Sequence, residues 1–147
     1  MGNRILVVED YEQLRDLIGD LLREIGRYSA DTAADGRTAE RLMVEQTFDL
    51  VVLDIGLPGI LSGRDIALLA RARFGCPILF ITGHDFPETY CADFMQPPDR
   101  LLRKPFKMEV LLAAVGAMLR AGAAEQMKTE RTRVRASPSS QCEAATL

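Results

Sequence analysis

The sequence predicts an α/β fold built around a parallel sheet that is buried on both faces. Short apolar runs alternate with longer amphipathic segments, as in repeated strand–helix units. The runs at residues 5–8, 50–53 and 78–81 contain no polar residue, which is typical of parallel strands covered by helices on both sides. Weaker strands are expected at residues 28–32 and 101–102. The chain has 147 residues, of which 48% are hydrophobic, so it can form one domain with a sound core.

The first predicted helix has the clearest pattern. Its apolar residues, among them Leu14, Leu17 and Ile25, recur on one face at helical spacing, and Gly26 then ends the helix. The last helix has a similar apolar stripe that includes Val110. Five helices are predicted in all, at about residues 14–25, 36–46, 64–74, 86–95 and 107–120.

A change of composition marks the end of the predicted domain. After Gly122 the apolar period stops, residues 128–135 are highly charged, and a Ser-Pro-Ser-Ser cluster begins at Ser137. Such a segment buries too little apolar surface to offset the entropy of ordering. We therefore predict a domain over residues 1–122 and a mostly disordered tail over residues 123–147.

Charge and composition exclude several classes of function. A formal net charge of -3 and an isoelectric point near 5.2 argue against direct binding of nucleic acid, which needs a basic surface. No apolar run approaches the ~20 residues that cross a bilayer, and no signal peptide is evident, so we expect a cytoplasmic protein without a membrane partner. The three cysteines are widely spaced and lack paired histidines, which indicates neither a disulfide framework nor a zinc site.

Polar side chains follow the predicted strands, at the edge where open α/β sheets bind their ligands. Glu9 and Asp10 follow the first run, Asp54 the run at residues 50–53, and Thr82 the run at residues 78–81. Lys104 follows the last strand. Because the carboxyl ends of parallel strands lie along one edge, we expect three carboxylates, a hydroxyl and an ammonium to share a pocket.

Charge suggests the chemistry of this pocket. Crowded carboxylates repel one another, and oxygen ligands without histidine or cysteine favour Mg²⁺ as the neutralising cation. A carboxylate beside such a cation can act as a nucleophile toward phosphorus. Asp54 is the best candidate because it stands alone after the central strand, whereas Glu9 and Asp10 are adjacent and better placed to hold metal. The alternatives are that Glu9 and Asp10 only cap the first helix and that Asp54 is a turn residue.

The ordered set of these motifs, with Lys104 followed by Pro105 and Phe106, closely resembles the receiver domain of two-component response regulators. The resemblance covers residues 3 to about 120. It implies a doubly wound, flavodoxin-like sheet of strand order 2-1-3-4-5 with five helices. It also implies a cis peptide bond between Lys104 and Pro105.

The resemblance assigns a role to each site residue. Asp54 would be the phosphoacceptor, and Glu9, Asp10 and Asp54 would hold Mg²⁺ together with the backbone carbonyl of Gly56. Thr82 would be the switch hydroxyl, and Lys104 would pair with the phosphoryl group. His84, the sole histidine, is interpreted as a loop residue that modulates solvent access to the site.

The sequence departs from the family pattern at Leu101, where the family usually has tyrosine or phenylalanine. Leucine cannot act as the ring that swings inward with Thr82, so Leu101 is a degenerate switch position. We therefore expect an activated state to change mainly the loops after Asp54 and Thr82 and the helix at residues 86–95.

Two functions follow from these observations. The first is a phosphorylation-controlled signalling module that is not an enzyme and accepts a phosphoryl group from a histidine kinase or a histidine phosphotransfer protein. The second is a constitutive protein-binding scaffold that no longer switches. Output through an unknown downstream protein is expected, and the face formed by the fourth helix, fifth strand and fifth helix is also a candidate surface for a homodimer. Candidate aromatic anchors on it are Phe86, Tyr90 and Phe94.

Overall fold

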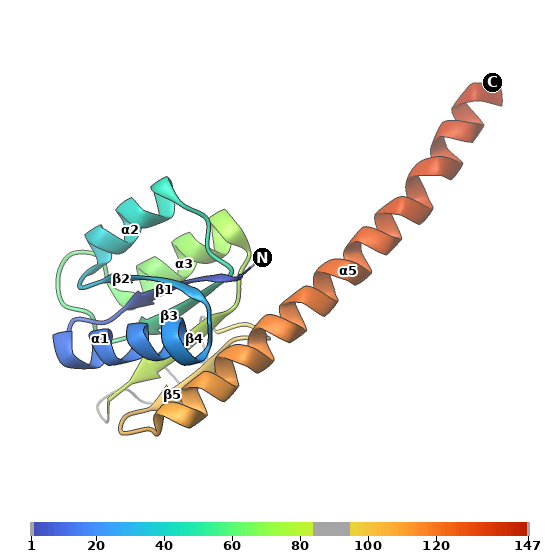
Figure 1. The fold of residues 1–147 in the computed structure, drawn as a ribbon. Coiled ribbons are helices and arrows are strands. Elements are labelled where there is room, and N and C mark those ends of the chain that lie inside the picture. Colours follow the sequence, from blue (N-terminus) through green and yellow to red (C-terminus); the bar gives the residue numbers. More distant parts are fainter. Residues whose placement is uncertain (1, 84–94, 147) are drawn as a thin grey trace.

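A computed structural model describes residues 2–83 and 95–146 and contains five parallel strands in one sheet. The order β2-β1-β3-β4-β5 agrees with the order that the resemblance implied (Figure 1). Val8 of β1 pairs with Leu53 of β3, and Asp54 of β3 pairs with Ile81 of β4, so the carboxyl ends of the central strands lie level. The strands are β1 (Arg4–Val8), β2 (Ser29–Ala33), β3 (Leu50–Asp54), β4 (Ile78–Thr82) and β5 (Arg100–Arg103).

Helices cover both faces of this sheet, as the uninterrupted apolar runs predict. Alternate residues of β1 point to opposite faces: Leu6 packs in the core beneath α2 and α3, and Val7 packs beneath the first and last helices. The described helices are α1 (Glu12–Asp20), the π-helical segment η1 (Leu21–Ile25), α2 (Gly36–Glu45), α3 (Gly63–Phe74) and α5 (Met108–Thr146). The helix predicted at about residues 86–95 falls almost wholly outside the described residues.

The first helix differs from its prediction in its last turn. The N–H of Gly26 donates to the carbonyl of Leu21 at 3.1 Å, a π-type bond that places one extra residue in the turn. This turn rotates Ile25 away from the sheet, and its side chain is 66% exposed although the apolar pattern predicted burial. Leu17 and Val110, also assigned to buried stripes, are exposed as well.

The last helix is longer than predicted. The apolar period indicated an end near Arg120, whereas α5 is helical from Met108 to Thr146 and leaves the domain as a projecting rod (Figure 1). Apart from Gly122, residues 121–128 all have high helix propensity, which accounts for continuation past Arg120. Among the described residues, no helix is long and apolar enough to span a membrane.

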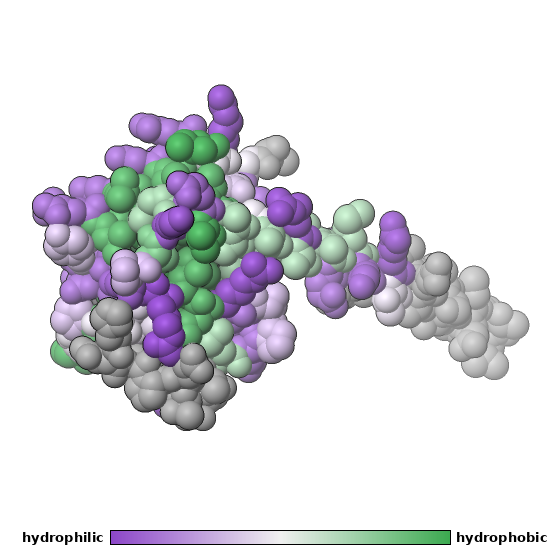
Figure 2. All heavy atoms as spheres, turned by 90° about the horizontal axis from the view of Figure 1, so that it is seen from below, coloured by the Kyte–Doolittle hydropathy of each residue, from purple (hydrophilic) through white to green (hydrophobic). Residues whose placement is uncertain are grey.

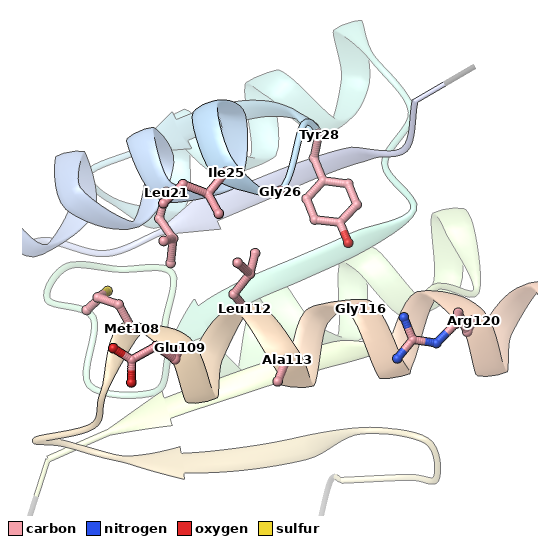
Figure 3. A pocket seen from close by; sticks show the side chains of 10 residues that line it. All are labelled: Leu21, Ile25, Gly26, Tyr28, Met108, Glu109, Leu112, Ala113, Gly116 and Arg120. Atoms are coloured by element: carbon pink, nitrogen blue, oxygen red, sulfur yellow. The ribbon is translucent and has the colours of Figure 1, made fainter.

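A groove of about 660 Å³ lies between η1 and α5 (Figure 3). Apolar side chains of both helices line it, including Ile25 and Leu112, while Glu109 and Arg120 lie toward its two ends. Seen from below, hydrophobic side chains form a band across the domain between hydrophilic ones (Figure 2). None of the polar residues that follow the strands lines this groove.

Candidate functional site

Four strands bring polar residues, at their last position or just after it, to one edge of the sheet. Glu9 follows β1 directly, Asp54 and Thr82 are the last residues of β3 and β4, and Lys104 follows β5. Glu9, Asp54 and Thr82 are buried, although they are polar. The N–H of Lys104 donates to the carbonyl of Thr82 at 2.7 Å, so the backbone joins the ends of the last two strands.

Lys104 links the two buried carboxylates. Its ammonium donates to both carboxylate oxygens of Glu9, at 3.2 and 3.1 Å, and to the Oδ2 atom of Asp54 at 3.2 Å. The backbone N–H of Gly56 donates to Oδ1 of Asp54 at 2.9 Å, so both oxygens of that carboxylate have a partner. A cation that pairs with both acids offsets part of their cost of burial.

The electrostatic consequences are clearest at Glu9. Burial, reinforced by the negative charge of Asp54, raises the pKa of Glu9 from 4.5 to about 7, although Lys104 acts in the opposite direction. Burial by itself would lower the pKa of Lys104, but the charges of Asp54 and Glu9 outweigh it and the pKa is raised. Lys104 therefore stays protonated, and Glu9 can take up a proton near neutral pH.

The site fits a hard divalent cation. Carboxylate oxygens of Glu9, Asp10 and Asp54 lie within 4.8 Å of one another, and Asp10 is exposed to solvent while the other two are buried. Such an oxygen-only set, open to water on one side, suits Mg²⁺, which binds through one or two carboxylates and keeps several waters. The acids that sequence placed at separate strand ends are thus together in space.

The backbone beside Asp54 is tightly packed. Gly63 begins α3, and a Cβ atom added there would lie 2.7 Å from the carbonyl oxygen of Asp54 and 2.8 Å from Cα of Ile55. The hydroxyl of Ser62 accepts from the N–H of Asp65, and the Asp65 carboxylate accepts from the N–H of Ser62, which fixes the start of α3. The missing side chain of Gly63 lets this helix approach the site closely.

The remaining predicted residues occupy different places. The hydroxyl of Thr82 donates to the carbonyl of Gly83 at 3.2 Å, and the peptide bond before Pro105 is cis, as the resemblance implied. Leu101 is half-buried and packs against the core that contains Phe80. His84 lies outside the described residues, as do the aromatic residues predicted to anchor a partner.

Sequence reasoning missed Arg15. One guanidinium nitrogen of Arg15 donates to the backbone carbonyls of both Glu9 and Asp10, at 3.1 and 3.3 Å. The available signal was its position in the first half of α1, where the helix dipole favours acidic rather than basic side chains. That signal is weak, because surface arginines are common.

This fold and this site define a class of protein: the receiver domains of two-component signalling, which are phosphoacceptors. A family model described as "Response regulator receiver domain" matches residues 5–116. The chain therefore belongs to the response regulator receiver domain family.

Relatives and solved structures agree with this assignment. The chain is 38% identical over 120 residues to the regulatory protein VanRB of Enterococcus faecalis, covering 82% of this chain and 54% of that protein. It is also 38% identical over 121 residues to the transcriptional regulatory protein TcrA of Mycobacterium tuberculosis, covering 82% and 47%. The chain thus spans about half the length of the curated relatives it matches.

Among solved structures, a response regulator receiver protein from Sinorhizobium medicae is similar, with a TM-score of 0.74 and 28% identity, covering 82% of this chain and 97% of that one. NtrX from Brucella abortus, solved in complex with ATP, has a TM-score of 0.78 and 27% identity. That match covers 88% of this chain and 29% of the NtrX chain.

Proposed function

We propose that this chain is a phosphorylation-controlled signalling module that accepts a phosphoryl group on Asp54 from a phosphohistidine protein. The observation that supports it best is the surroundings of Asp54. Asp54 is the last residue of a fully buried strand. Its carboxylate contacts Lys104 and lies beside two further carboxylates that can hold a cation. The phosphodonor would be a histidine kinase or a histidine phosphotransfer protein.

The proposed transfer is a displacement at phosphorus. A carboxylate oxygen of Asp54 forms the new P–O bond, and the P–N bond of the phosphohistidine breaks with its electron pair returning to the imidazole nitrogen. Mg²⁺ bound by Glu9, Asp10, Asp54 and the carbonyl of Gly56 would neutralise charge on the phosphoryl oxygens. Asp54 thereby becomes an acyl phosphate.

Two further residues would respond to the new group. Lys104 would exchange its bond to Asp54 for bonds to phosphoryl oxygens, which carry more negative charge than the carboxylate did. The Thr82 hydroxyl would turn from the Gly83 carbonyl, its present acceptor at 3.2 Å, toward the phosphoryl group. These changes would alter a surface that a downstream protein recognises.

Leu101 supports the second candidate, a constitutive scaffold, because leucine has no ring to report the state of Thr82. The presence of Asp54, Thr82 and Lys104 at one edge favours the switching module. A scaffold would not require a carboxylate, a hydroxyl and an ammonium group to lie together at this edge of the sheet.

The test uses phosphoramidate, a small donor that carries the same P–N bond as phosphohistidine. With Mg²⁺ present, mass spectrometry should detect one phosphoryl group on the wild type and none on Asp54→Asn. Removal of Mg²⁺ with EDTA should abolish the reaction. An unmodified wild type would leave the scaffold as the better description.

A further inference from the structure

We propose that Arg15 is a positioning residue for the cation site, holding the turn after β1 so that Asp10 faces the pocket. The inference rests on the proposed function, since it concerns the Mg²⁺ that Asp10 would help to bind. Among the described residues, Arg15 makes no hydrogen bond to the carboxylate of Glu9, Asp10 or Asp54. It donates instead to the backbone carbonyls of Glu9 and Asp10, which are two of the proposed ligands.

The geometry of this contact is specific. One nitrogen, Nη1 of Arg15, donates to the carbonyl of Glu9 at 3.1 Å and to the carbonyl of Asp10 at 3.3 Å. Both carbonyls must be directed toward the same nitrogen atom, and this requirement constrains the backbone between Glu9 and Asp10. Arg15 is itself held in α1, where its N–H donates to the carbonyl of Tyr11 at 2.9 Å.

The two acids depend on Arg15 to different degrees. The backbone of Glu9 is also fixed by its own N–H, which donates to the carbonyl of Ala33 at 3.1 Å. Its carboxylate accepts hydrogen bonds from the ammonium of Lys104 and from the N–H of Tyr11. Asp10 is exposed, and its carbonyl is reached by Arg15. Loss of Arg15 should therefore displace Asp10 more than Glu9.

The charge of Arg15 and its proposed positioning role predict opposite changes in Mg²⁺ affinity when Arg15 is removed, so the sign of the measured change distinguishes them. A guanidinium near the carboxylates repels a divalent cation, so removing it should strengthen Mg²⁺ binding if charge alone matters. If Arg15 positions the turn, removing it should weaken Mg²⁺ binding, because outer-shell partners of metal ligands commonly change affinity by about 10–100-fold.

The experiment is a Mg²⁺ titration of the whole chain, followed by amide shifts in NMR spectra, on four proteins. Arg15→Ala should bind Mg²⁺ about tenfold more weakly than wild type, the lower end of the range for outer-shell partners. Arg15→Lys should recover part of this loss, because an ammonium can still donate to a carbonyl. Unfolding in urea without Mg²⁺ measures any separate effect on stability.

Arg23→Ala is the matched control. Arg23 also donates to a backbone carbonyl, that of Ala30 at 3.0 and 2.8 Å, but it lies at the other end of the same helical segment. It should leave Mg²⁺ affinity unchanged even if it lowers stability by as much as Arg15→Ala does.

Unchanged or tighter Mg²⁺ binding by Arg15→Ala, with a wild type that binds, would overturn the positioning role and leave the proposed function intact. A wild type that binds no Mg²⁺ would overturn both. If Arg15→Ala does not fold, Arg15→Lys decides the matter: weaker binding than wild type supports positioning, and equal or tighter binding contradicts it.

Discussion

The ammonium group of Lys104 lies 3.2 Å from the Oδ2 atom of Asp54, although 50 residues separate them in the chain. With Gly56 bound to the other oxygen, the carboxylate of Asp54 has a donor on each side. A phosphoryl group that reaches Asp54 must therefore change the contacts of Lys104. This arrangement links any change at Asp54 to the end of β5.

Mg²⁺ affinity should depend on pH because Glu9 must lose its proton to bind the cation. The pKa of Glu9 is raised to about 7 by burial and by the charge of Asp54, so Glu9 becomes ionised as the pH rises through neutrality. We expect the apparent affinity to increase about tenfold from pH 6 to pH 8. Calorimetric titration at several pH values measures this, and Asp10→Ala should abolish binding throughout. An affinity that does not vary with pH would contradict the role of Glu9.

The metal-free protein should become more stable at pH 8 when Glu9 is replaced by glutamine. Because the folded-state pKa of Glu9 is raised from 4.5 to about 7, its stabilising contribution is complete below pH 4.5 and is lost as the pH rises through 7. Glu9→Gln removes this pH-dependent loss of stability, so we expect its free energy of unfolding at pH 8 to exceed that of the wild type by roughly 1–3 kcal/mol.

Urea unfolding with EDTA at pH 5 and pH 8 tests this prediction. Glu24→Gln, which changes an exposed carboxylate on η1, is the control and should have little effect at either pH. A Glu9→Gln protein that is less stable than wild type at pH 8 would show that ionised Glu9 is net stabilising.

Gly63→Ala should destabilise the domain by roughly 1–3 kcal/mol, because overpacking of this kind requires the backbone to move. The added Cβ would meet backbone atoms of Asp54 and Ile55 at 2.7 and 2.8 Å. Gly122→Ala is the control: the space around that Cβ is open, and alanine favours the helix by about 1 kcal/mol. Thermal unfolding of both variants measures the difference, and equal melting temperatures would argue against close packing at Gly63.

Periodicity and strand ends predicted most of the strands and helices and the meeting of the polar residues at one edge of the sheet. Uninterrupted apolar runs identify buried parallel strands, and parallel strands necessarily bring Glu9, Asp54, Thr82 and Lys104 to one edge. The strand order was predicted from the family resemblance and not from the pattern of apolar residues. The strand order of the structure agrees with the one that the resemblance implied, and Asp54 and Thr82 end their strands while Glu9 and Lys104 directly follow theirs.

The features that were missed depend on bonds that have no periodic signature. The π-type bond to Leu21 shifts the phase of the first helix, so Ile25 is exposed although its spacing predicted burial. The contact of Arg15 with two carbonyls depends on the shape of a turn, which the residue types do not specify. The continuation of α5 past Arg120 reflects helix propensity, whereas the prediction relied on the loss of an apolar face.

Activation should leave the Leu101 side chain in place. It is half-buried against the core and has no ring that could swing between two positions. In a complex with Mg²⁺ and beryllofluoride, which stands in for the phosphoryl group, we expect shifts in the loops after Asp54 and Thr82. Methyl NMR spectra of free and bound protein compare the two states. A movement of Leu101 from outside to inside would contradict the prediction.

The central claim is that Asp54 is the single phosphoacceptor, and acetyl phosphate tests it most directly. Wild-type protein treated with acetyl phosphate and Mg²⁺ should gain the mass of one phosphoryl group, and peptide mapping should place that group on Asp54. Asp54→Asn should gain none under the same conditions. A phosphoryl group on a serine or threonine, or the same gain in Asp54→Asn, would contradict this account of the site.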